Sequence, residues 1–278
     1  MQKPQISIVM PAFNSEETIS ASIQSVLSQT FKNWELIIVD DASEDGTAKL
    51  VFREYDDKRI KLIQNSANMG PAGARNVALE CAIGDFIAFL DADDLWTPEK
   101  LKLQLSFMQN NNCAISFTSY WRLGKTDSQK HQDKKAAKKI SYEDLLDQNG
   151  IGCLTAMIDR RKLPNLRFSN LSEIMGSVKT NRLFKFLLKG RVGHEDYAFW
   201  LAALRPQEGQ PPLLAYGLDE PLAYYRIGSG SFSANKFQAA LSQWFIYRYV
   251  ENLTFWRSLK HFSRYAFTGV YSRWRSRS

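Results

Sequence analysis

The clearest chemical feature of this sequence is a run of carboxylates, Asp91-Ala92-Asp93-Asp94, directly after the apolar residues 86–90. Clustered carboxylates repel one another unless a cation or solvent offsets their charge. Carboxylate oxygens at this spacing suit Mg²⁺ or Mn²⁺, which commonly bridges carboxylates and a diphosphate. The alternative is an ordinary acidic loop in which Asp93 or Asp94 caps the next turn of helix.

A second acidic pair, Asp40-Asp41, follows the apolar run 36–39. As hydrogen-bond acceptors, these carboxylates could recognise the base or the ribose of a nucleotide. They could equally form an Asx-turn, because the next residues, Ala-Ser-Glu-Asp-Gly, are typical of turns.

Three further stretches carry groups that could bind a phosphate or take a proton. Arg75 follows the loop 68–73 and could meet a phosphate or a base, or be a solvated helix arginine. His194-Glu195-Asp196 could supply a general base, or only acids that complement a helix dipole. Residues 225–231, which include Arg226 and Ser229, could form a lid over a diphosphate or a surface turn.

These groups need elements to position them, and the first hundred residues alternate between strand and helix patterns. Apolar runs predict buried strands at 6–10, 36–39, 60–63 and 86–90. Helical spacing follows each strand, with Asn14 and Glu17 as a capping box and Thr97-Pro98 as a helix start. The order predicts an α/β fold, a mostly parallel sheet with helices on both faces. Ligands bind such sheets beyond the carboxyl ends of the strands, where both acidic clusters fall.

The second half of the sequence is less regular. Strands are predicted at 114–121 and 154–158, and a helix at 194–204. Prolines at 211, 212 and 221 bracket short strands that end at Arg226, and the Lys-rich stretch 124–139 predicts an exposed loop. Residues 172–188 have mixed helical character, and the longer stretch 165–193 has no assigned role.

Length and composition limit the class of protein. The chain of 278 residues is long for one domain and short for two, so we expect one α/β domain with appendages. Three scattered cysteines favour a reducing compartment over a disulfide framework. The N-terminus has no apolar signal region and no stretch is long enough to span a membrane, which predicts a soluble or peripheral cytoplasmic protein. Neither GxGxxG nor a P-loop is present.

The net charge of +7 belongs to the C-terminal tail. Residues 236–278 carry eight Lys or Arg and one acidic residue, and residues 237–274 hold 12 of the 35 aromatic side chains. Interleaved bases and aromatics predict a helix that lies on an anionic membrane surface. The alternative for residues 235–262 is packing on the rest of the chain as a helical appendage. Nucleic-acid binding would use the same charge, but it does not explain acids at strand ends, so no nucleic-acid partner is predicted.

Taken in order, these stretches resemble the bacterial family 2 glycosyltransferases of the GT-A fold. The resemblance is closest to the group that builds O-antigen lipopolysaccharide, capsule or teichuronic-type chains on lipid-linked acceptors. It is strongest over residues 5–110 and rests on the segments 7–14, 25–31, 39–43, 68–76, 89–94, 195–200 and 225–226. It implies a catalytic domain over 1–234, with a nucleotide-sugar half at 1–110 and an acceptor half at 111–234, and a separate tail at 235–278.

The resemblance also implies roles for single residues. It places Asp196 as the catalytic base, Asp93 as a direct metal ligand, and Asp91 near the ribose or a metal-bound water. It places Asp41 at the uracil ring and Arg75 near uracil or phosphate. The rest of the implied nucleotide-sugar site consists of Pro11, Ala12, Phe13, Asn14, Ala92, Glu195, Arg226 and Ser229.

The reaction so implied is an inverting, metal-dependent transfer of a sugar from a UDP-sugar to a hydroxyl of a lipid-linked acceptor. We therefore expect Mn²⁺ or Mg²⁺ as cofactor and a peripheral place on the inner face of the plasma membrane. A nucleotidyltransferase is the alternative enzyme. Such enzymes usually carry a basic phosphate loop near the N-terminus, whereas residues 11–14 contain no basic side chain.

Overall fold

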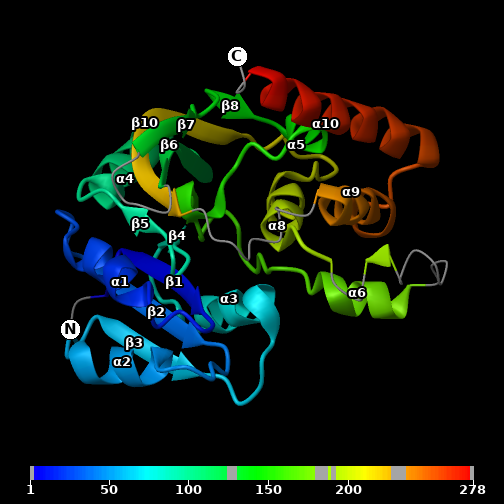
Figure 1. The fold of residues 1–278 in the computed structure, drawn as a ribbon. Coiled ribbons are helices and arrows are strands. Elements are labelled where there is room, and N and C mark those ends of the chain that lie inside the picture. The colour runs from blue at the N-terminus through cyan, green and yellow to red at the C-terminus, as the bar shows by residue number, and fades with distance from the viewer. Residues whose placement is uncertain (1–2, 124–129, 179–186, 189–191, 227–235, 276–278) are drawn as a thin grey trace.

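The first half of the chain is a regular α/β unit (Figure 1). The computed structural model describes residues 3–123, 130–178, 187–188, 192–226 and 236–275. Strands and helices alternate as predicted: β1 (Ile6–Ala12), α1 (Ile19–Leu27), β2 (Trp34–Asp40), α2 (Thr47–Glu54), β3 (Ile60–Gln64), α3 (Gly70–Cys81), β4 (Phe86–Phe89) and α4 (Lys100–Asn110).

A single mixed sheet runs through the molecule in the order β3-β2-β1-β4-β9-β6-β10-β5. The first four of these strands are parallel, so Asp40 and Asp91 follow strands that end at the same edge. The other half combines β5 (Leu95–Trp96), β6 (Ile115–Leu123), β9 (Met157–Asp159) and β10 (Ala215–Arg226). There β9 runs antiparallel to its neighbours, and β10 runs parallel to β6. The predicted α/β fold is confirmed.

Alternate residues of each buried strand belong to two separate hydrophobic cores. Ile6, Ile8 and Met10 pack with the helices α1 and α4 on one face of the sheet. Val9 and Ile37 pack on the opposite face, with α3 and with the second half of the chain. Successive side chains of a strand point to opposite faces. The continuous apolar runs therefore reflect a sheet that is covered on both sides.

The second face is covered by helices from the later part of the chain: α5 (Tyr142–Asp147), α6 (Leu171–Ser177), α8 (Glu195–Leu204) and α9 (Lys236–Phe245). A π-helical turn, η3 (Ile246–Val250), follows α9, and α10 (Phe255–Arg275) lies across α5 (Figure 1). Phe245, Ile246 and Tyr247 are fully buried in the same core as Val9. Part of the predicted tail is therefore an integral layer of the fold. None of the described helices is long and apolar enough to cross a membrane.

The predicted loop at 124–139 is wrong in part. Residues 130–134 form β7 (Lys130–Lys134), which pairs with β6, and β8 (Lys139–Ile140) pairs with β10. Residues 124–129 lie outside the described part. The strands expected around Pro221 are one strand, β10, whose pairing with β6 shifts register at that proline. Proline cannot donate to the ladder, which explains the irregularity.

Two predicted helix starts are also wrong. Asn14 has a positive φ of 48° and does not cap α1, whose N-cap is Thr18. It instead links two loops, because its N–H donates to Ser43 Oγ and its Oδ1 accepts from Glu44 N, both at 2.9 Å. The other helix, α4, begins at Lys100 with Glu99 as N-cap, rather than at Thr97-Pro98.

Gly84 allows β1 to approach the turn before β4 closely. A Cβ at this position would lie 2.6 Å from the backbone nitrogen of Ser7, and that nitrogen cannot move aside. We expect Gly84→Ala to lower the free energy of unfolding by about 1–3 kcal/mol through overpacking. Gly176→Ala is the control, since a Cβ there meets no atom within 4 Å. Denaturant unfolding of both variants tests this, and equal stability of Gly84→Ala and the parent would contradict it.

Candidate active site

The carboxylate run sits in a tight turn at the carboxyl end of β4. Leu90 continues the sheet through a hydrogen bond from its N–H to Val9 O, and Asp94 N donates to Asp91 O to close the turn. The buried Ser22 hydroxyl of α1 donates to Ala92 O at 2.9 Å. This loop is therefore held by the sheet on one side and by α1 on the other.

Arg75 links this loop to α3. Its Nη2 lies 2.6 Å from Asp91 Oδ1, and the arginine is almost fully buried. Burial acts to lower the pKa of Arg75, but the charge and hydrogen bond of Asp91, together with Cys153 and Asp196, outweigh burial and raise that pKa above its ordinary value. Within the described residues, the buried Nε of Arg75 has no hydrogen-bond partner. The guanidinium is thus a fixed cation that retains a donor for a ligand.

The predicted base, Asp196, stands in the first turn of α8 beside Glu195. His194 precedes them with a φ of 71°. Because non-glycine residues adopt this left-handed conformation at a cost of about 1–3 kcal/mol, it points to a functional constraint. Burial and, to a smaller extent, the Asp196 charge raise the pKa of Glu195.

Arg75 links these predicted residues through one direct ion pair and through longer-range electrostatic interactions. Its charge interacts with those of Asp91 and Asp196, and the Glu195 carboxylate interacts with Arg75 and Asp91 in turn. The structure therefore brings α3, the turn after β4 and the start of α8 into one charged site.

Arg226 brings the end of β10 to the same turn. Its backbone N–H donates to Asp94 Oδ1 at 2.9 Å, and its Nε donates to Asp93 O at 3.0 Å. Burial, then repulsion from Asp93 and Asp91, raises the pKa of Asp94 well above its ordinary value. Asp94 thus connects β10 to the acidic turn, while Asp93 is exposed. Ser229, also predicted for this lid, lies outside the described residues.

The predicted nucleotide end of the site lies around Asp41. Its backbone N–H donates to Ala12 O, which joins the segment 11–14 to the end of β2. The Asp41 carboxylate accepts from Asn65 Nδ2 at 2.7 Å and from Met69 N at 3.0 Å, so protein groups already occupy much of its acceptor capacity. Within the described chain, Asp40 Oδ1 is buried without a hydrogen-bond partner. Phe13 is exposed beside this end, whereas Ala12 is buried.

Two residues at the site carry no signal in the sequence. Cys153 begins the short helix η1 (Cys153–Thr155), and its buried thiol interacts with the charges of Arg75, Asp91 and Asp196. Phe168 stacks on Phe199 of α8 with ring centroids 4.0 Å apart, and the Arg75 guanidinium lies 5.3 Å from its ring. Part of the unassigned stretch 165–193 therefore forms an apolar wall of the site.

The residues of the turn fit a divalent cation that arrives with a diphosphate. Asp93 and Asp91 supply hard carboxylate oxygens. Desolvation and repulsion from Asp91 raise the pKa of Asp93, and a bound cation would relieve this repulsion. In the described part of the chain, no three His, Cys, Asp or Glu side chains are grouped as a metal site. The remaining ligands would therefore be phosphate oxygens and water, which is usual for Mg²⁺.

A buried polar network between α4 and η1 supports the site. Lys100 of α4 is fully buried, and its ammonium donates to Gln104 Oε1 and to Thr155 O. Gln104 Nε2 also donates to Thr155 O at 2.9 Å, and Trp96 Nε1 donates to Leu154 O at the same distance. These contacts fix η1, and with it Cys153, against the helix that follows the acidic turn.

Lys100 makes stability depend on pH. Burial lowers the pKa of Lys100 from 10.5 to about 7. At pH values between these two, Lys100 is therefore protonated in the unfolded chain and deprotonated in the folded chain. Stability due to this group therefore rises with pH. Between about pH 6.5 and about pH 9.5, we expect the parent to gain about 3 kcal/mol more unfolding free energy than Lys100→Met. Lys102→Met, on the exposed side of the same helix, is the control and should behave as the parent. Parallel pH profiles of the parent and Lys100→Met would contradict the expectation.

Comparison with known proteins shows the family of this chain. The family model of glycosyl transferase family 2 matches residues 7–183. The chain is 37% identical over 273 residues to the glycosyltransferase TuaG of Bacillus subtilis, a protein named for teichuronic acid biosynthesis, with 98% of each chain covered. It is 40% identical over 239 residues to WfgD of Escherichia coli, covering 86% of this chain and 83% of WfgD. The name of WfgD is UDP-Glc:alpha-D-GlcNAc-diphosphoundecaprenol beta-1,3-glucosyltransferase.

The fold has counterparts among solved structures. The crystal structure of residues 1–349 of Staphylococcus aureus TarS in complex with UDP-GlcNAc superposes with a TM-score of 0.66. The match has 20% sequence identity and covers 94% of this chain and 71% of the TarS chain. The family model spans more than half of the sequence and includes Arg75 and the acidic turn. The chain belongs to glycosyl transferase family 2.

Proposed function

We propose that the protein transfers a sugar from a UDP-sugar to a hydroxyl of a lipid-linked glycan acceptor, with inversion at the anomeric carbon, in the synthesis of a bacterial surface polysaccharide. The observation that carries this proposal is the buried Arg75–Asp91 ion pair at the acidic turn, on which the Asp196 charge also acts. Family membership supplies the reaction class, and the site supplies groups for both ends of a sugar nucleotide.

The donor and acceptor classes are proposed from the relatives. WfgD is named for a UDP-glucose donor and an acceptor sugar on diphosphoundecaprenol, and the TarS structure holds UDP-GlcNAc. TuaG is named for a polysaccharide pathway. In this chain, the acceptors around Asp40 and Asp41 suit the donors of a base or ribose.

In the proposed mechanism Asp196 is the general base. Its carboxylate takes the proton of the acceptor hydroxyl while that oxygen attacks the anomeric carbon from the face opposite the nucleotide. The new carbon–oxygen bond forms as the bond to the diphosphate breaks, and UDP leaves. A single displacement inverts the configuration and needs no second carboxylate as nucleophile, in contrast to a retaining glycosidase.

Charge on the departing diphosphate is met by fixed groups of the chain. Arg226 is held at the acidic turn by Asp93 O and Asp94, and Arg75 is held by Asp91. Preorganised cations of this kind stabilise developing charge without reorganising during the reaction. A divalent cation held by Asp93, with Asp91 beside it, would add electrophilic stabilisation of the leaving UDP.

The test is a transfer assay with a panel of UDP-sugars and a diphospholipid-linked monosaccharide. The panel is first narrowed by thermal stabilisation with Mn²⁺ present, since a ligand of the native state raises apparent stability. We expect stoichiometric release of UDP and a product whose anomeric configuration is opposite to that of the donor. Release of pyrophosphate would support a nucleotidyltransferase instead. Retained configuration would exclude a single displacement by the acceptor hydroxyl with Asp196 as base.

A further inference from the structure

The helix α10 has two faces of different character. Its inward face carries Ser258, His261, Phe262 and Tyr265 at helical spacing, and Ser258 and His261 are almost completely buried. Its outward face carries large apolar side chains in contact with solvent: Phe255 (51% exposed), Trp256 (76%), Leu259 (41%) and Phe267 (72%).

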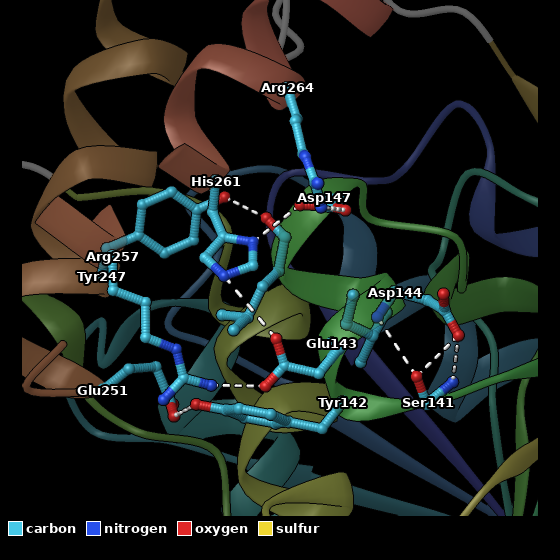
Figure 2. Close-up of polar contacts among 12 residues, drawn as sticks. Ser141, Tyr142, Glu143, Asp144, Asp147, Tyr247, Glu251, Arg257, His261 and Arg264 are labelled. Atoms are coloured by element: carbon cyan, nitrogen blue, oxygen red, sulfur yellow. Dashed lines mark hydrogen bonds and ion pairs between the residues drawn. The ribbon is translucent and has the colours of Figure 1, made fainter. Parts of the chain in front are cut away.

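A polar clamp fixes which face of α10 points outward (Figure 2). His261 Nδ1 lies 2.6 Å from Asp147 Oδ1, and His261 Nε2 lies 3.6 Å from Glu143 Oε2. Arg257 pairs with Glu143, and Arg264 Nη1 lies 2.8 Å from Asp147 Oδ2. Both carboxylates belong to α5, so α10 cannot rotate its apolar face inward without breaking these pairs.

Three basic residues of α10 border its apolar face. Arg257 and Arg264 lie between the inward and outward faces, and Lys260 is exposed on the same border. One long helix with an apolar face, including tryptophan, and a border of bases matches the side chains of a helix that lies in the headgroup layer of a bilayer. Single exposed apolar residues need no explanation, but a row along one helix marks an interaction site.

We propose that the outward face of α10, formed by Phe255, Trp256, Leu259 and Phe267, docks the enzyme on an anionic lipid surface. The apolar side chains would enter the headgroup region, while Lys260 and the net positive charge of residues 236–278 would draw the helix to acidic lipid. Arg257 and Arg264 stay paired with α5. The inference rests on the proposed function, because it places the enzyme where a lipid-linked acceptor lies. The proposal gives the two faces of α10 different roles. The inward face packs on α5 through the ion pairs, and the outward apolar face contacts lipid.

The test is flotation of the full chain with vesicles of phosphatidylcholine alone or mixed with phosphatidylglycerol. We expect salt-sensitive binding to the mixed vesicles, lowered about tenfold or more in Trp256→Ser/Phe267→Ser, since each large side chain contributes to burial in the interface. Phe52→Ser is the matched control, because Phe52 is 83% exposed on the remote helix α2. Phe52→Ser should float as the parent does.

Three outcomes would overturn the proposal. The first is that the parent does not bind the mixed vesicles, and the second is that the double variant binds them as well as the parent does. The third is that the parent forms a concentration-dependent dimer that the double variant does not form. That result would assign this face to contact with a second copy of the chain. Transfer is measured in parallel with a short-chain, water-soluble acceptor. If the parent transfers sugar but does not float, only the lipid surface is refuted. If the parent floats but neither it nor the variants release UDP, the proposed function is refuted instead.

Discussion

Replacing Asp196 by asparagine is expected to lower kcat by about 10²–10⁴-fold and to leave UDP-sugar affinity close to that of the parent. The amide cannot accept the proton of the acceptor hydroxyl at neutral pH. Asp196 stands in the first turn of α8, where its charge interacts with that of Arg75. The nucleotide is expected around Asp41, at a different part of the sheet edge, so removal of the base should leave its binding intact.

The measurement combines steady-state kinetics with calorimetric titration of the UDP-sugar. Asp56→Asn makes the same chemical change at an exposed position after α2 and should keep parent kinetics. Near-parent kcat in Asp196→Asn would remove this residue as the base. A loss of donor affinity with little change in kcat would instead place Asp196 in donor binding.

The strands that position the site could be predicted from the sequence because they are buried on both faces. The run at 36–39 is continuously apolar and the run at 6–10 is interrupted only by Ser7, and the structure divides their apolar side chains between two cores. The edge strand β7 could not be predicted in this way. It is polar and Lys-rich, and it is a strand only because β6 offers it a hydrogen-bonding edge.

The site residues also differ in how far the sequence predicts their positions. Local patterns could place Asp91 at the end of a strand and Asp196 at the start of a helix, and the structure has them there. Their roles come from the family resemblance and stay predictions. Cys153 and Phe168 could not be placed in this way, because their places depend on packing between segments far apart in the chain. Phe168 is held by Asn76, whose side chain exchanges two 2.9 Å hydrogen bonds with its backbone across 92 positions.

The composition of the C-terminal tail fits both packing on the rest of the chain and contact with a membrane. Packing and membrane contact were alternatives for residues 235–262. The structure shows packing for α9, for η3 and for the inward face of α10. The number of basic residues in the tail could not distinguish the inward face of α10 from its outward face. Two of those residues, Arg257 and Arg264, form ion pairs with α5.

The second large effect is expected at the acidic turn. Asp93→Ala should weaken UDP binding in the presence of Mn²⁺ by about 100-fold or more, because even an outer-shell partner of a metal ligand is worth about 10–100-fold in metal affinity. Asp93 is exposed, so its truncation should leave the melting temperature close to that of the parent. Asp94 is different, since it is buried and accepts from Arg226 N.

UDP affinity is therefore measured with Mn²⁺ and with a chelator, for the parent and for Asp93→Ala. Without metal the two proteins should bind alike, because the variant retains Arg75, Asp91 and the loop around Asp41. With metal only the parent should gain affinity. Asp91→Ala cannot serve as a matched control, since it would also leave the buried guanidinium of Arg75 without its 2.6 Å partner. An equal gain from Mn²⁺ in both proteins would show that Asp93 is not a ligand and that the cation binds through other groups.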